Sequence, residues 1–386
     1  MSTKRKIEEV IFFTYGDSSD ASTWSNVPYL FTRTLEKKGI TVRRVNLYEG
    51  LTRLTKIADK IIRAEKKVLR SRSTFRFQMS RIFIALAYRN IKRAVKTFPN
   101  ADLCIFACYD FYNKFSSIPT LLFGDWTLEI LVRDRMRREP DSPETRYIRH
   151  QNEVMTKAEH VVTLFPYSQR LMLGYCPESD ARHMGMNVVN DMNPKPHPAA
   201  DTLIEGKRAA QKILFIGNAK YIDGARRLVE AFRLIRRNLP GASLDIIGMT
   251  GHELAVEGIE GVRCHGYLRK DVPAEAEKYY SLLSQASVFV NPTRGWAGYS
   301  STIEAMFYHI PVVVAPYDDF TAEFGKDISF GAFQHSDSAE DLAKNILSVM
   351  TSENYARMCR DAHNAVAGYT WDKYVDKILA TVSLNP

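Results

Sequence analysis

The sequence predicts an α/β fold made of two Rossmann-like domains in tandem. Apolar runs of strand length alternate with amphipathic helical segments in both halves of the chain, which is typical of doubly wound parallel sheets. This periodicity stops between residues 190 and 207, where three prolines occur without a strand pattern. The chain has 386 residues, more than one ordinary core holds, so two domains are expected.

The first half begins with a strand rich in β-branched and aromatic residues, followed by a polar loop and a helix that ends at Gly39. A later helix opens at Ser168. The other predicted elements are strand 10–14, helix 27–38, strand 41–47, a basic helical region, strands 103–107 and 119–123, helix 144–158 and strand 160–164.

The second half repeats the alternation, with strands that are short, apolar and bounded by glycine or polar residues. Its predicted elements are strand 212–216, helix 225–238, strands 243–247 and 262–265, helix 274–285, strands 288–291 and 311–315, and two or three helices in 338–384. The expected domains are 1–190 and 211–367, with a linker at 191–210. A C-terminal helix within 368–386 is expected to pack back on the first domain.

Composition narrows the class of protein. Apolar content of 45% and charged content of 25% are ordinary for a globular protein. No apolar run approaches the roughly 18 residues of a membrane span, and the N-terminus lacks the apolar segment of a signal peptide. The five cysteines are scattered without zinc spacing. These features predict a cytoplasmic protein with buried, reduced thiols.

The net charge of +9 is concentrated in residues 53–96, where apolar residues recur at helical spacing among lysines and arginines. Two interpretations are open. The region binds an anionic membrane, as a peripheral contact on its inner face, or it is a solvated helix face that happens to be basic. Nucleic acid is not expected as a partner, because no recognised motif accompanies the charge.

The most informative segment is 291–314, which reads N-P-T-R-G-W-A-G-Y-S-S-T-I-E-A-M-F-Y-H-I-P-V-V-V. A buried strand runs into a hydroxyl-rich loop, and a helix then starts near Ser300. Ligands of open α/β sheets bind at the carboxyl ends of strands, and a helix start offers free N–H groups to phosphate. Glu304 can accept hydrogen bonds from sugar hydroxyls. The segment therefore predicts a nucleotide-sugar site.

Four segments together resemble the C-terminal domain of a GT-B glycosyltransferase, in glycosyltransferase family four (glycosyl transferases group 1). They are I-L-F-I-G-N-A-K-Y-I-D-G-A-R-R-L-V-E-A-F at 213–232, L-D-I-I-G at 244–248, C-H-G-Y-L at 264–268 and the segment 291–314. Shorter similarities are Y-T-W-D at 369–372 and, in the first half, W-S-N-V-P-Y-L at 24–30.

The resemblance implies two Rossmann-like domains that face a cleft, the GT-B architecture. It implies a retaining hexosyl transfer from a UDP- or GDP-sugar to a glycan or lipid-linked acceptor, in polysaccharide or lipopolysaccharide synthesis. The chain has no Asp-x-Asp loop, which favours a reaction without a metal, and no cofactor is expected.

The resemblance also implies roles for individual residues. Asp125 is expected to meet the transferred sugar or the acceptor hydroxyl, and Lys220 and Arg294 are expected to stabilise the diphosphate charge. Donor binding is expected at Gly16, Asp17, Gly217, Asn218, Arg226, Gly298, Tyr299, Ser300, Ser301 and Glu304.

Three positions depart from the family pattern. Trp296 stands where the first of two glutamates is usual, and Asn218 and Asp223 replace an arginine and a lysine that clamp the diphosphate. Whether the site is active with these residues is left open. A non-catalytic GT-B-like scaffold or sugar-nucleotide-binding protein is the alternative, and an epimerase or phosphorylase on the same fold is a further one.

Overall fold

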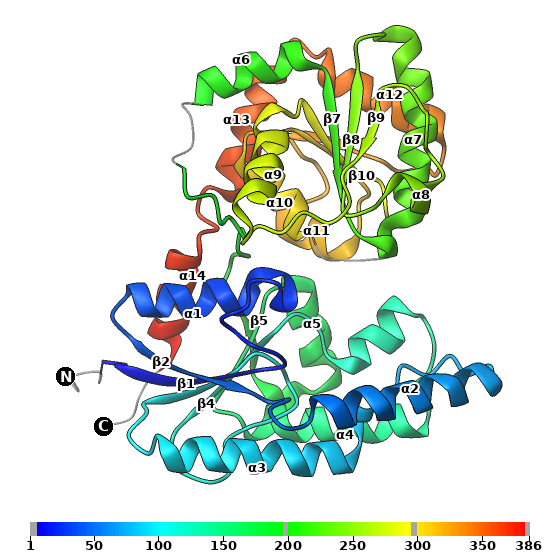
Figure 1. Ribbon diagram of the computed structural model, residues 1–386. Coiled ribbons are helices and arrows are strands. Elements are labelled where there is room, and N and C mark those ends of the chain that lie inside the picture. The colour runs from blue at the N-terminus through cyan, green and yellow to red at the C-terminus, as the bar shows by residue number, and fades with distance from the viewer. Residues whose placement is uncertain (1–5, 196–199, 295–298, 383–386) are drawn as a thin grey trace. The chain divides into compact units, whose positions relative to one another are not determined.

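The computed structural model describes residues 6–195, 200–294 and 299–382 (Figure 1). Its contacts divide the chain into two compact units, one of residues 1–187 with 371–386 and one of residues 188–370. Each unit contains a six-stranded, wholly parallel sheet with helices packed against it. The predicted α/β class with two Rossmann-like domains is therefore confirmed.

The sheet of the first unit has the order β2-β1-β3-β4-β5-β6. Val10 on β1, next to the edge strand, pairs with Val42 on one side and with Leu103 on the other. The direction of strand addition thus reverses between β1 and β3. The strands are β1 Glu9–Thr14, β2 Thr41–Asn46, β3 Leu103–Phe106, β4 Thr120–Gly124, β5 His160–Thr163 and β6 Ala181–His183.

Helices of the first unit come from both ends of the chain. The C-terminal helix α14, Trp371–Thr381, packs against α1, Val27–Lys37, and the rings of Phe31 and Trp371 lie 5.5 Å apart. The basic region forms two helices, α2 and α3, rather than one. The remaining helices are α2 Thr52–Val68, α3 Arg81–Thr97, α4 Ser142–Lys157, α5 Pro166–Tyr175 and a π-helix at Ile130–Arg135.

The sheet of the second unit has the order β12-β11-β10-β7-β8-β9, and its order reverses between β7 and β10. Its strands are β7 Lys212–Ile216, β8 Ser243–Ile247, β9 Val262–Cys264, β10 Val288–Asn291, β11 Val312–Val314 and β12 Gly331–Phe333. Its helices are α6 Ala200–Ala210, α7 Ile222–Asn238, α8 Gly251–Leu254, α9 Pro273–Gln285, α10 Ser300–Phe307, α11 Asp318–Phe324, α12 Ala339–Met350 and α13 Tyr355–Val366.

Within the predicted linker 191–210, residues 200–210 form helix α6. Its buried face consists of Leu203, Ile204 and Lys207. Because a lysine occupies one of three buried positions, the apolar pattern of this helix is too weak to be recognised in the sequence. Strands β6 and β12 were also missed, because their sequences, Ala-Arg-His and Gly-Ala-Phe, contain no run of β-branched residues.

Lys207 is fully buried between α6 and α9. Its Nζ atom donates to the carbonyl of Leu283 at 2.9 Å and to that of Ala286 at 3.4 Å. Burial lowers the pKa of Lys207 to about 7, because a low-polarity environment disfavours the ammonium form. A neutral amine still has two N–H donors, one for each carbonyl, so the buried side chain keeps weaker versions of both hydrogen bonds after losing its proton.

This burial predicts a pH-dependent stability. Between pH 7 and the ordinary lysine pKa of 10.5, the unfolded chain binds the proton that the folded chain has released. The free energy of unfolding should therefore rise with pH, by up to roughly 1.4 kcal/mol per pH unit. Urea unfolding of the wild type and of Lys207→Met from pH 7 to 9.5 measures the difference. Parallel pH profiles for the two proteins would contradict the prediction.

Candidate functional site

The strand reversal of the second unit brings two loops together, one after β7 and one after β10. The Ser301 hydroxyl, in the first turn of α10, lies 3.4 Å from the Ile216 carbonyl at the end of β7. Gly224, in the first turn of α7, faces the loop after β10 so closely that a Cβ atom would collide with Thr293 Oγ1. Helix starts and strand ends thus meet at one point, where open α/β sheets bind their ligands.

Several predicted donor residues lie at this reversal. Gly217 and Asn218 follow β7 directly, and Asn218 caps the short turn into α7 by accepting from the Lys220 N–H at 3.1 Å. Lys220 and Arg226 are exposed on the same connection, whereas Ser300 and Ser301 begin α10. The structure therefore brings together cations, hydroxyls and a helix start, which are groups that bind phosphate.

The side chain of Tyr299 does not line the site. It is fully buried, it packs edge-on against Phe320, and its hydroxyl donates to Glu323 at 3.2 Å. Only the backbone of Tyr299 can face a phosphate, which corrects any expectation of a side-chain role. Gly298 and Trp296, which also belong to the predicted site, lie outside the described residues.

Glu304 is buried, with 3% of its surface exposed. Lys270 Nζ donates to its two carboxylate oxygens at 2.5 and 2.7 Å, and Tyr279 Oη donates to Oε2 at 2.9 Å. Lys270 also donates to the Asn190 carbonyl at 3.0 Å. Burial raises the pKa of Glu304, and the neighbouring ammonium of Lys270 opposes that rise.

This pairing restricts what Glu304 can do. A carboxylate offers about four acceptor positions, and three are used here, two on Oε2 and one on Oε1. A ribose hydroxyl would have to take the remaining position on Oε1 or displace Lys270. In this structure the predicted donor-binding carboxylate connects α10, α9 and the chain segment before α6.

Arg294 is likewise engaged within the second unit. Its guanidinium contacts the His335 carbonyl and lies 3.7 Å from Asp337, a carboxylate that also pairs with Arg227 at 2.8 Å. The side chain is 46% exposed, so this contact is weak and exchangeable. Arg294 would have to leave it to reach a diphosphate at the strand reversal.

In the first unit, Gly16 and Asp17 follow β1. Gly16 has φ +94°, a left-handed conformation that favours glycine, and its N–H donates to Asn46 at 3.1 Å. Asp17 accepts from the Ser19 N–H at 2.8 Å and from the Ser19 hydroxyl at 2.7 Å. These hydrogen bonds lower the pKa of Asp17. Its carboxylate therefore stabilises its own loop.

Asp125 follows β4 and lines two adjoining cavities of about 220 Å³ each. Both cavities are also lined by Asp110, Trp126 and Gln151. Asp110 is 6% exposed, and its carboxylate accepts from Tyr15 Oη at 2.9 Å and from Gln151 Nε2 at 2.8 Å. The sequence analysis missed Asp110, although an acidic residue just after an apolar strand is a signal that could have identified it.

Across residues 6–195, 200–294 and 299–382, no cluster of three or more histidine, cysteine or acidic side chains is arranged to hold a metal ion. Within the same ranges, no helix has both the length and the apolar character that crossing a bilayer requires.

The comparisons with known proteins agree with this geometry. Residues 210–352 match the family Glycosyl transferases group 1. The match runs from the end of α6 to the end of α12 and includes both loops at the strand reversal of the second unit. Among curated proteins, none matches the chain in sequence.

Solved structures share the fold along nearly the whole chain. A sucrose-phosphate synthase from Thermosynechococcus elongatus has a TM-score of 0.62 at 13% identity, covering 97% of this chain and 100% of its own. HepE from Anabaena, solved with UDP and glucose, gives 0.61 at 12% identity with the same coverage. WaaG, a glycosyltransferase of lipopolysaccharide biosynthesis, gives 0.61 at 13% identity, again covering 97% and 100%. The fold is that of the GT-B glycosyltransferases.

The buried ion pair between Lys270 and Glu304 in the second unit allows a test of stability. Lys270→Met leaves the Glu304 carboxylate buried without a counter-charge, which should lower the free energy of unfolding by about 3–5 kcal/mol. Adding Glu304→Gln removes that charge and should recover part of the loss. Urea unfolding of the single and double variants measures both effects. If Lys270→Met unfolded like the wild type, the pair would contribute nothing to the fold.

Proposed function

We propose that the protein is a retaining glycosyltransferase that moves a sugar from a nucleotide-sugar donor, a UDP- or GDP-sugar, to a glycan or lipid-linked acceptor. The observation that carries the proposal is the match of residues 210–352 to group 1 glycosyl transferases, at a strand reversal where phosphate-binding groups converge. Cell-surface polysaccharide or lipopolysaccharide synthesis is the pathway class that this donor and acceptor suggest.

The chemistry requires stabilisation of the negative charge that develops on the departing diphosphate. The N–H groups in the first turn of α10 and the exposed cations Lys220 and Arg226 supply positive potential at the strand reversal. Arg294 adds a third cation if it exchanges its contact with Asp337. These protein groups account for charge stabilisation, so we propose a reaction in which no metal takes part.

The first unit supplies carboxylates, which carry the opposite charge. Asp125 and the buried Asp110 line adjoining cavities at the ends of β3 and β4. A carboxylate there can orient an acceptor hydroxyl and accept its hydrogen bond. We assign Asp125 to this role because it is less buried than Asp110.

A second candidate is a non-catalytic protein that binds a nucleotide sugar or a partner. The engagement of Glu304 with Lys270, and of Arg294 with Asp337, favours it, because both side chains already have other partners. Donor binding without transfer would identify this function, and interconversion of the donor without an acceptor would indicate an epimerase.

Donor binding can be tested by thermal stabilisation with UDP-, GDP-, dTDP- and ADP-sugars. One nucleotide is expected to raise the melting temperature of the wild type, and Glu304→Gln should weaken that response roughly tenfold in ligand concentration, because an amide is a poorer acceptor for ribose hydroxyls. Asp245→Asn is the matched control, since Asp245 is also a buried, ion-paired carboxylate of this unit but lies on β8.

Each variant is compared with its own unliganded melting temperature, which separates donor binding from stability. An unchanged response in Glu304→Gln would remove Glu304 from the donor site. The absence of a response to all four nucleotides in the wild type would leave the non-catalytic alternative.

We also propose that α2 contacts an anionic membrane. Of its residues, only Thr55 is buried, whereas Leu54, Ile57, Ile61 and Val68 are exposed along one stripe. Five cations, Arg53, Lys56, Lys60, Arg63 and Lys67, accompany this stripe. A helix with an exposed apolar stripe and a basic surface fits a bilayer with negative lipids, which would cover the apolar side chains and pair with the cations.

Co-sedimentation with phosphatidylglycerol vesicles tests the membrane contact. Ile57→Ser combined with Ile61→Ser should weaken binding about tenfold, because two apolar side chains no longer enter the lipid. Tyr267→Ser, which removes an exposed aromatic side chain of the other unit, is the control. Equal binding by both variants would show that the α2 stripe is not the contact.

A further inference from the structure

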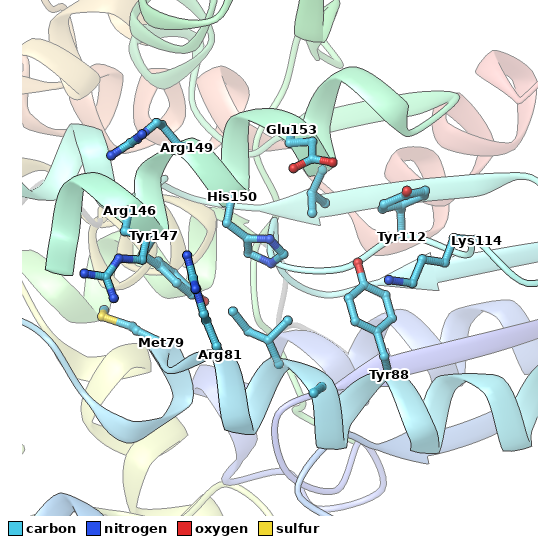
Figure 2. A pocket seen from close by; sticks show the side chains of 13 residues that line it. Met79, Arg81, Tyr88, Tyr112, Lys114, Arg146, Tyr147, Arg149, His150 and Glu153 are labelled. Carbon is cyan, nitrogen blue, oxygen red and sulfur yellow. The ribbon is translucent and has the colours of Figure 1, made fainter.

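A cavity of the first unit lies between α3, α4 and the loop after β3, away from the two cavities at the strand ends (Figure 2). Its volume is about 510 Å³, within the range of about 300–1,000 Å³ that is usual for small-molecule sites. Its walls carry Arg81, Lys114, Arg146 and Arg149 and a single carboxylate, Glu153. The function proposed above does not use these residues.

The walls of this cavity carry more cations than carboxylates. In the part of the chain that the structure describes, no carboxylate pairs with Arg81, Arg146 or Arg149. The one acidic group of the wall, Glu153, is paired with Lys157 at 2.6 Å. Guanidinium groups without carboxylate partners leave a positive potential in the cavity, and they are suited to bidentate binding of phosphate or carboxylate.

Aromatic rings share the walls with the cations. Tyr88, Tyr112 and Tyr147 line the cavity, and Lys114 Nζ lies 3.7 Å from the centre of the Tyr88 ring. Figure 2 shows Arg81 and Arg146 near Tyr147 on one side and Lys114 near Tyr88 on the other. Aromatic rings give a ligand an apolar face to pack against. Rings beside cations therefore fit a ligand that has both an apolar ring face and a negative group.

A buried carboxylate outside the cavity wall connects α4 to the chain segment that precedes α3. Glu144 on α4 accepts from Arg138 at 2.6 Å and from the N–H of Thr74 at 2.6 Å, and Arg138 also donates to the Arg72 carbonyl. Burial alone would raise the pKa of Glu144, but the hydrogen bonds from Arg138, Thr74 and Asp141 lower it to about 2. The segment before α3 is thereby fixed to α4, so the two arginine-bearing walls are preorganised.

The cavity lies next to a second one near the strand ends. Met79 and Tyr147 line both this cavity and the one that contains Asp110 and Asp125, so these two side chains form the boundary between the two spaces. An extended ligand that crosses this boundary would place a reacting hydroxyl near Asp125 and a more distant part among the arginines.

We propose that this cavity binds an acidic saccharide, a sugar that carries a phosphate or carboxylate group, as the distal part of the acceptor. The inference rests on the proposed glycosyltransferase function, whose acceptor class it names. Arg81 and Arg146 bind the acidic group, and Tyr112 packs against the sugar ring.

Glucose 6-phosphate is the probe, titrated calorimetrically into the full chain and compared with glucose and with inorganic phosphate. We expect it to bind more tightly than either, because only it has both parts. Arg81→Gln combined with Arg146→Gln should weaken its binding at least tenfold. Arg89→Gln combined with Arg93→Gln removes the same charge from exposed positions of α3 outside the cavity and should change binding less than twofold.

Tyr112→Ala separates the two parts of the ligand. It should weaken glucose 6-phosphate binding and leave inorganic phosphate unchanged. Equal effects of the two arginine pairs would overturn the proposal, as would inorganic phosphate that binds as tightly as glucose 6-phosphate. Loss of phosphatidylglycerol vesicle binding in Arg81→Gln/Arg146→Gln, with unchanged glucose 6-phosphate binding, would also overturn it, in favour of a lipid headgroup site.

The nucleotide-sugar response separates this inference from the proposed function. Both arginine pairs should keep the thermal response to the donor. A donor response without glucose 6-phosphate binding would overturn this inference alone. Glucose 6-phosphate binding without any donor response would remove the proposed transfer, and the cavity would then be a saccharide-binding site without an acceptor role.

Discussion

The buried ion pair between Lys270 and Glu304 determines how the second unit is assembled around its strand reversal. It connects α10, α9 and the segment that leads into α6 through one carboxylate. The side chains of Lys270 and Glu304 are only 10% and 4% exposed, so removing one charge leaves the other poorly compensated. The glutamate of the glycosyltransferase motif is therefore structural in this state, whatever it does for a donor. A loss of activity on its removal would be ambiguous, whereas an amide replacement keeps the shape and changes the charge.

Both units gather polar groups where their strand order reverses, for the same geometric reason. Helices cover the faces of each sheet, but at the reversal they diverge and leave the strand ends accessible. What collects there differs between the units. The first unit presents the carboxylates Asp110 and Asp125, and the second presents a helix start with Lys220 and Arg226. Carboxylates suit the hydroxyl group of an acceptor, whereas a helix start and cations suit a diphosphate. Each unit taken separately therefore carries the groups for a different ligand.

The sequence correctly predicted those elements that a pattern of neighbouring residues encodes. Strands β7, β8 and β10 were predicted to the residue, because buried parallel strands are continuous apolar runs. Helix α6 was not predicted, since Lys207 occupies a core position. The cavity lined by Arg81 and Arg146 was not predicted either. These residues are 65 positions apart in the sequence, and they line one cavity only because α3 and α4 both contribute to its walls. The contact of Glu304 with Lys270 is equally non-local, so the motif alone gave no sign of it.

Many of the lysines and arginines of the first unit lie on two surfaces, helix α2 and the cavity lined by Arg81 and Arg146, which the stability of the fold does not explain. Helix α2 buries Thr55 and leaves Ile57 and Ile61 in water, although exposed apolar area contributes nothing to the fold. Arg81 and Arg146 line one cavity, and neither forms an ion pair within the described residues. Each arrangement becomes more favourable with a negatively charged partner. Because the first exposes apolar side chains on a convex helix and the second lines a concave cavity with tyrosines, the two call for partners of different shape, a lipid surface and a small acidic ligand.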